Sequence, residues 1–238
     1  MADDKIHPQH AARALGRLGR AGMRRLDSTP EDLPPLERFL REWQSRRLAH
    51  THADLLASQE YGPATRFFLT DIYAPKDFSR RDADLLALYE FLSRILPAAA
   101  LRVLKNTVEL NTLTHDLETQ MVEDLRTLGV TDSFTTEQYE AAYRQGDYEA
   151  RVRQIALIVE IGRDLGHISR LPFIGPTLHA AGIPARQLGW GELQDFLERG
   201  YYAWRTLRRP EPFLHAIEAR ETTILNRIFK RERGDHGI

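Results

Sequence analysis

The sequence predicts an all-α protein, a single compact bundle of about eight or nine helices with a basic N-terminal arm. Apolar residues recur at helical spacing along most of the chain, and no segment alternates apolar and polar residues as a strand does. Glycine and proline residues divide the periodic stretches at short intervals. With 238 residues, 42% of them hydrophobic, the chain can bury a substantial core.

The first 33 residues are predicted to be a basic arm and linker, and residues 34–238 the helical domain. Residues 5–26 carry five arginines and no acidic residue, with leucines between them. The pattern fits a peripheral helix with a solvated basic face, an arm that grips an acidic surface, or a transit-like leader. The stretch Asp27–Pro35 is rich in turn formers and acids that favour the start of a following helix.

Helix breakers and capping residues delimit the predicted helices after this linker. Pro63 and Pro97 suit first helical turns, Asp77-Phe-Ser79 caps a helix that reaches about Leu96, and Gly129 ends the longest helix. The other helices are predicted over residues 34–59, 97–128, 135–145, 148–169, 173–181, 190–208 and 211–230.

Composition excludes several classes of function. The formal net charge of -1 gives no field that attracts nucleic acid or a membrane, and only the N-terminal arginines favour nucleic acid. The absence of cysteine excludes disulfides and thiolate chemistry. No apolar run spans a membrane or resembles a secretory signal, so we expect a cytoplasmic protein. No phosphate loop, nucleophile elbow or zinc-binding His-Glu-x-x-His occurs.

Polar residues interrupt the predicted apolar faces in several helices. In the helix over 34–59, the apolar stripe of Leu36, Leu40 and Trp43 continues into Arg47, His50 and Asp54. His50 and Asp54 lie one turn apart, so they can form a buried network with Arg47 or bind one ion. The full predicted stripe of this helix consists of Leu36, Phe39, Leu40, Trp43, Arg47, His50 and Asp54.

Two later helices repeat this combination. In the helix over 97–128, His115 and Glu118 fall within the buried stripe, three residues apart. In the helix over 148–169, Glu160 and His167 line one edge, with Arg163 as the expected ion partner of Glu160. Near the C-terminus, Glu221 lies within the stripe, whereas His215 and Glu218 point outwards. The interpretations are satisfied polar networks or metal ligation.

These residues supply the inventory of a metal site. Carboxylate-bridged di-iron bundles use about four carboxylates and two histidines from facing helices, usually with Glu before His. The haem-oxygenase-like di-iron fold is one such scaffold of about this size, and a haem ligated by His50 or His115 is also open. The candidate metal ligands are His50, Asp54, His115, Glu118, Glu160 and His167, with Glu109 as the weakest further member.

The densest motif runs from Arg66 to Asp82 and combines aromatic, acidic and arginine side chains. Its aromatics can plug the junction between two helices while its charges tie the turn together. Alternatively, it forms the mouth of a pocket for an anionic ligand. The candidate ligand-binding residues are Arg66, Asp71, Tyr73 and Arg81.

The run Phe67-Phe-Leu-Thr-Asp-Ile-Tyr73, followed by Asp77-Phe-Ser-Arg-Arg-Asp82, resembles the signature of an uncharacterised bacterial all-helical family. The stretch Leu193–Gly200 and the Arg220-Glu221 pair are similar to the C-terminal half of that family. The resemblance implies a bacterial helical protein and carries no established activity, so it assigns no catalytic residue.

Two hypotheses follow from the sequence. The first is a non-catalytic cytoplasmic protein that binds a partner protein or a small ligand through the bundle and the 66–82 junction. The alternative is a metal- or haem-dependent helical oxidoreductase of the di-iron type, with iron or haem held by the buried histidines and carboxylates. Convergence of the candidate ligands on one point would separate the two hypotheses.

Overall fold

A computed structural model describes residues 33–72, 98–187 and 191–230 of the chain. The predicted all-α class is confirmed: the described residues form nine α-helices and one π-helical turn, with no strand among them. The predicted N-terminal arm and the predicted helix that ends near Leu96 lie outside the described residues.

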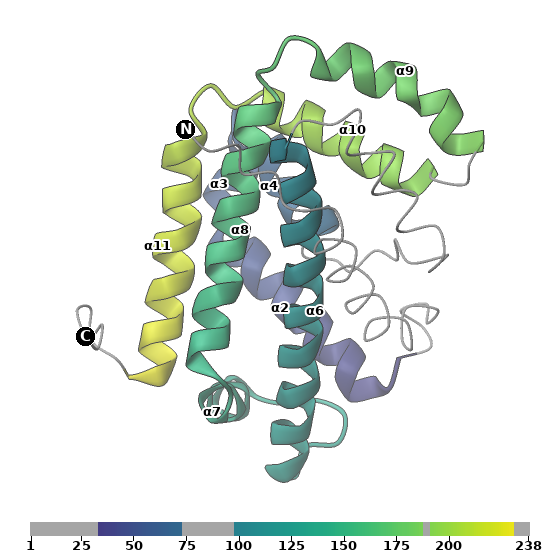
Figure 1. The fold of residues 1–238 in the computed structure, drawn as a ribbon. Helices are drawn as coiled ribbons and strands as arrows, with labels where there is room; N and C mark the ends of the chain where they lie inside the picture. Colours follow the sequence, from purple (N-terminus) through teal and green to yellow (C-terminus); the bar gives the residue numbers. More distant parts are fainter. Residues whose placement is uncertain (1–32, 73–97, 188–190, 231–238) are drawn as a thin grey trace.

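Three long helices lie side by side and form the body of the bundle (Figure 1). They are α6 (Ala98–Thr127), α8 (Tyr148–Ile168) and α11 (Pro210–Phe229), with α8 in the middle. Helix α7 (Thr136–Gln145) closes one end of this layer. Helices α9 (Ile174–Gln187) and α10 (Gly191–Arg205) pack together at the opposite end.

The N-terminal helices run behind this layer in the view of Figure 1. They are α2 (Pro35–Thr51), α3 (Ala53–Ala57), α4 (Gly62–Phe67) and the π-helical turn η2 (Phe68–Ile72). Helix α4 packs against α10, so the first and last thirds of the described chain meet at the α9–α10 end of the bundle.

Several helix ends follow the capping signals of the sequence. Thr135 and Gln138 form a reciprocal capping box at the start of α7, and the Asp147 side chain accepts a hydrogen bond from the Ala150 amide at the start of α8. Gly129 adopts a positive φ of 79° after α6, and Val130 then donates to the carbonyl of Leu125. The predicted stop at Gly129 is therefore confirmed.

Two boundaries differ from the prediction. The helix expected over 34–59 is broken at His52, whose φ of -114° and ψ of 24° separate α2 from α3. Helix α9 does not end near 181 but continues through Gly182 and Pro184 to Gln187. Proline lacks the N–H of one helical hydrogen bond, so α9 continues despite that loss.

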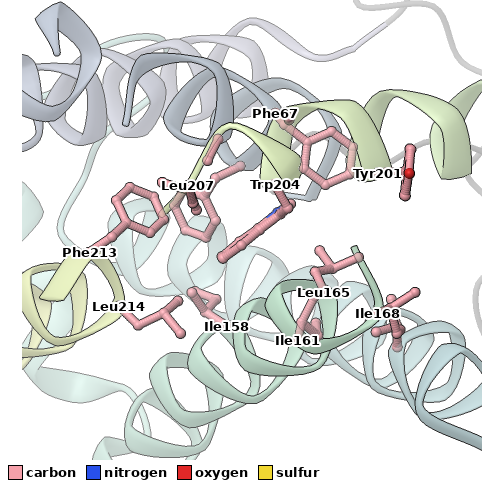
Figure 2. Close-up of a cluster of buried hydrophobic side chains, with 14 of the residues drawn as sticks. Phe67, Ile158, Ile161, Leu165, Ile168, Tyr201, Trp204, Leu207, Phe213 and Leu214 are labelled. Carbon is pink, nitrogen blue, oxygen red and sulfur yellow. The ribbon is translucent and has the colours of Figure 1, made fainter. Parts of the chain in front are cut away.

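Buried apolar side chains form two clusters. The larger cluster lies where α4, α6, α8, α10 and α11 meet, and Figure 2 shows Trp204 at its centre between Leu207, Phe213 and the α8 side chains. Gly162 permits this contact, since a Cβ there would lie 2.4 Å from Leu214 and 2.8 Å from Trp204. The smaller cluster joins α2, the end of α6 and α7: Leu36, Leu40, Met121, Val122, Leu125, Val130, Phe134, Tyr139 and Ala142.

Candidate functional site

An open groove with a volume of about 510 Å³ runs between α4, η2 and α10. We call it the α4–α10 groove. Gly200 allows the two helices to approach, because a Cβ at this position would lie only 2.9 Å from the Phe67 ring. The groove is lined by Pro63, Arg66, Phe67, Thr70, Asp71, Asp195, Glu198, Arg199, Tyr202 and Ala203.

Asp71 is a buried carboxylate in the groove wall, with 5% of its side chain exposed. Arg199 of α10 donates from Nε to Asp71 Oδ1 at 3.0 Å, and its Nη2 lies 2.8 Å from the same oxygen. The Thr70 hydroxyl donates to Asp71 Oδ2 at 2.9 Å. The ion pair fastens η2 to α10 and supplies the counter-charge that a buried carboxylate requires.

The α10 wall carries a face of charged and aromatic residues. Asp195, Glu198 and Tyr202 are separated by three and four residues, so they follow one another along one side of the helix. Glu198 accepts a hydrogen bond of 2.6 Å from Gln194, which also donates to the main-chain oxygen of Leu178 in α9. Tyr202 is 59% exposed at the groove.

The structure brings together two of the four ligand-binding residues predicted from the sequence. Arg66 and Asp71 both line the α4–α10 groove. The predicted aromatic plug is also present for Phe67 and Phe68, since both rings are buried. Tyr73 and Arg81 lie outside the described residues.

The α10 half of this groove was not predicted from the sequence. The stretch Leu193–Gly200 was noted for its family resemblance and not as part of a site. The available signal was the spacing of Asp195, Glu198 and Tyr202, which places two acids and an aromatic ring on one helical face. The pairing of that face with η2 depends on a contact across 128 residues and leaves no local pattern.

The candidate metal ligands of α2 and α3 are not where the sequence predicted them. His50 and Asp54 are both exposed. Asp54 accepts two hydrogen bonds from Arg220 of α11, at 2.6 and 2.8 Å, and hydrogen bonding by Arg220 lowers the pKa of Asp54 to about 2. The break at His52 accounts for Asp54, because it shifts the helical register in which the prediction placed Asp54 on the buried stripe, whereas His50 precedes the break and is exposed within α2 itself.

The buried imidazole of this region is His52, which the sequence analysis did not select. His52 is 1% exposed, and its Nε2 lies 3.0 Å from Glu221 Oε1. Arg47 donates from Nη1 to the other oxygen of Glu221 at 2.9 Å. The predicted interior positions of Arg47 and Glu221 are confirmed, since their side chains are mostly buried. This triad of Arg47, His52 and Glu221 joins α2 to α11.

Burial alone would raise the pKa of Glu221, but the hydrogen bond from His52 and the charge of Arg47 together hold it below its ordinary value. Glu118 of α6 shows the opposite balance. It is mostly buried and paired with Arg41 at 3.1 Å, yet burial outweighs this pair and raises its pKa. His115 lines a cavity of about 10 Å³ with Glu118 and Arg41.

The remaining predicted ligands lie on the outside of α8. Glu160 is 41% exposed and accepts hydrogen bonds from Arg153 at 2.9 Å and Asn106 at 3.2 Å. Its expected partner Arg163 instead pairs with Glu211 of α11. His167 is exposed.

Glu109 accepts a hydrogen bond of 2.8 Å from Arg153, so it shares this arginine with Glu160. Within the described ranges, no group of three or more histidine, aspartate or glutamate side chains is placed to hold a metal ion. Each predicted carboxylate ligand pairs instead with an arginine: Asp54 with Arg220, Glu118 with Arg41, and Glu160 with Arg153.

None of the described helices is both long and apolar enough to cross a membrane. Residues 23–235 match the family described as a domain of unknown function (DUF8198). The chain belongs to this family. Both walls of the α4–α10 groove lie inside the DUF8198 domain, and the expected membership of an uncharacterised family is confirmed. No curated protein and no solved structure matches the chain significantly.

Proposed function

We propose that this DUF8198 protein is a non-catalytic binding protein that holds a segment of a partner protein in the α4–α10 groove. The recognised feature is a basic side chain of that segment. The observation that carries the proposal is the α10 face, where the exposed ring of Tyr202 follows the carboxylates of Asp195 and Glu198 in an open groove.

The charge balance of the groove favours a cationic group. Asp71 and Arg199 neutralise each other in the wall. Among the described lining residues, the three carboxylates of Asp71, Asp195 and Glu198 stand against the two arginines Arg66 and Arg199, which gives this lining a formal charge of -1. A lysine or arginine side chain that enters the groove gains attraction from this excess negative charge.

The aromatic and apolar parts of the groove suit a peptide chain. A cation placed over a tyrosine ring gains about 0.5–1 kcal/mol at an exposed site. Tyrosine is also enriched at protein interfaces, because one ring offers both apolar area and a hydroxyl group. Phe67, Pro63 and Ala203 supply the apolar lining that the aliphatic stem of a basic side chain can cover.

The architecture supports binding as the role of the groove. The walls are fixed before any partner arrives, by the ion pair of Asp71 with Arg199 and by the bond from Gln194 to α9. A preformed groove loses less conformational entropy on binding than a flexible loop does. We also propose that the protein works in the cytoplasm of a bacterium, on the basis of its cysteine-free sequence and its family resemblance.

A peptide selection tests the proposal. A phage-displayed library of random 12-residue peptides is panned against the protein, with the double variant Glu198→Gln/Tyr202→Ala used for counter-selection. We expect the selected peptides to be enriched in lysine and arginine and to bind the double variant at least tenfold more weakly, as measured by fluorescence anisotropy of synthetic copies. The matched control is Asp132→Asn/Phe173→Ala, which removes an exposed acid and an exposed ring outside the groove.

Three results would overturn the proposal: no peptide is selected, the selected peptides lack basic residues, or they bind the double variant as tightly as the wild type. Thermal unfolding of both double variants establishes that they are folded. Tyr202 is exposed and Glu198 is replaced by an isosteric amide, so neither change removes a buried group.

A further inference from the structure

A second pocket, of about 350 Å³, lies at the end of the bundle where α8 leads into α9 and α10 leads into α11. It shares no lining residue with the α4–α10 groove. None of the described residues that line it is acidic. We call it the arginine pocket, and its lining consists of Ser169, Arg170, Leu171, Pro172, Tyr201, Trp204, Arg205, Leu207 and Arg208.

The three arginines of this pocket carry positive charge without a counter-charge. The guanidinium of Arg170 donates to the main-chain oxygen of Arg208 at 2.9 Å, and that of Arg205 donates to the Tyr201 hydroxyl at 2.7 Å. Both acceptors are neutral. Within the described part of the chain, none of the three arginines forms a salt bridge.

Other arginines of the described chain are arranged differently. Arg102, Arg163 and Arg220 each direct two guanidinium nitrogens at one carboxylate of a neighbouring helix. Each guanidinium has five N–H donors, and the hydrogen bonds of Arg170 and Arg205 given above use one donor each. The arginine pocket therefore keeps most of its donors for water or a ligand.

The pocket has a rigid frame. The main chain of the α8–α9 turn is closed by hydrogen bonds from Arg170 to His167 and from Leu171 to Ile168. The Arg208 amide donates to the Glu60 carboxylate at 3.0 Å, which anchors the α10–α11 turn to the connection before α4. The hydrogen bond from the Arg170 guanidinium to the main-chain oxygen of Arg208 then joins the two turns.

One wall of the arginine pocket is apolar and tightly packed. Trp204 and Leu207 are buried in the larger apolar cluster (Figure 2), and both line the arginine pocket. Trp204 and Leu207 are 2% and 4% exposed, so the apolar surface that is open beside the three cations is that of Leu171 and Pro172. Its volume lies in the range of about 300–1,000 Å³ that is typical of small-molecule sites.

We propose that the arginine pocket binds a small organic phosphate monoester. Guanidinium groups bind phosphate oxygens through paired, charge-assisted hydrogen bonds, which suits a dianion surrounded by several arginines. The organic part of the ester lies against Leu171 and Pro172. A phosphate with an aromatic body therefore binds more tightly than inorganic phosphate.

Isothermal titration calorimetry of the full chain tests this proposal, with phenyl phosphate, inorganic phosphate, benzoate and a phosphoserine peptide as separate ligands. We expect phenyl phosphate to bind most tightly, and its affinity to fall as salt is raised. The variant Arg208→Gln should weaken it by about 10- to 100-fold, as expected for a lost hydrogen bond between charged groups. The side chain of Arg208 has no hydrogen bond within the described residues, so this variant keeps the fold.

The control variant is Arg126→Gln, an exposed arginine at the far end of α6, which should bind as the wild type does. The groove variant Glu198→Gln/Tyr202→Ala should also retain phenyl phosphate binding, which separates this site from the groove. Failure to bind phenyl phosphate, equal affinity of Arg208→Gln and the wild type, or tighter binding of the phosphoserine peptide would each overturn the proposal.

Discussion

Glu221 and Glu118 are both mostly buried and paired with arginine, yet we expect their replacement by glutamine to change stability in opposite directions. Glu221 accepts charge-assisted hydrogen bonds from His52 and Arg47, and its pKa is lowered. Glu118 is bonded to Arg41 alone among the contacts described, and burial raises its pKa. The number of partners decides whether a buried carboxylate is favoured as an ion.

The magnitude follows from the hydrogen bonds of Glu221. A hydrogen bond to a charged group contributes about 1.5–3 kcal/mol and a neutral one about 0.5–1.5 kcal/mol. Glu221→Gln removes the negative charge and turns one of the two acceptor oxygens into an amide NH2, which cannot accept from Arg47 or His52, so the free energy of unfolding should fall by about 2–3 kcal/mol at pH 7. Glu118→Gln removes an ion that burial disfavours, so its free energy of unfolding should stay equal or rise at pH 7.

The pH dependence of the free energy of unfolding tests the same argument independently. The lowered pKa of Glu221 means that its contribution is present above the ordinary glutamate value of 4.5 and is lost as pH falls through the folded value. The difference between Glu221→Gln and the wild type should therefore shrink below about pH 4.5. The raised pKa of Glu118 destabilises the fold as pH rises above 4.5, so Glu118→Gln should gain most at neutral pH.

Urea denaturation followed by circular dichroism from pH 3 to pH 8 measures both effects, with the exposed Glu123→Gln as the control. Equal stability of Glu221→Gln and the wild type at pH 7, or a loss that does not change with pH, would refute the role assigned to the triad of Arg47, His52 and Glu221. A large loss in Glu118→Gln would refute the argument from partner number.

Two further outcomes are expected. Gly162→Ala should lower the free energy of unfolding by about 1–2 kcal/mol in urea denaturation, because overpacking against Leu214 and Trp204 outweighs the helix propensity gained; a stabilised variant would contradict this. Elemental analysis of the purified protein should show no stoichiometric iron or manganese, and its absorbance spectrum should show no Soret band. The same result is expected after anaerobic addition of iron and haem. Stoichiometric metal that is lost in His115→Ala would reinstate the oxidoreductase hypothesis.

Much of the fold follows from local patterns in the sequence. Helical periodicity, the capping box at Thr135 and the positive φ at Gly129 depend on neighbours a few residues away. Pro184 shows the limit of this logic, because α9 continues past a residue that disfavours a helix.

The candidate site was predictable only on one side. The motif that contains Arg66 and Asp71 is visible in the sequence, but its partner Arg199 is 128 residues away from Asp71. The prediction of Asp54 as a metal ligand depended on one helical register being kept from residue 34 to residue 59. The break at His52 changes the direction of every side chain beyond it, since each helical residue turns by about 100°.

The triad of Arg47, His52 and Glu221 also sets an order of events during synthesis. Glu221 is translated 169 residues after His52, which takes roughly 10–30 s at a ribosomal rate of about 5–20 residues per second. Throughout this interval, the side chains of Arg47 and His52 lack the Glu221 carboxylate to which both are bonded in the folded protein. The contacts of Arg47 and His52 with α11 therefore form only after this last helix has been synthesised.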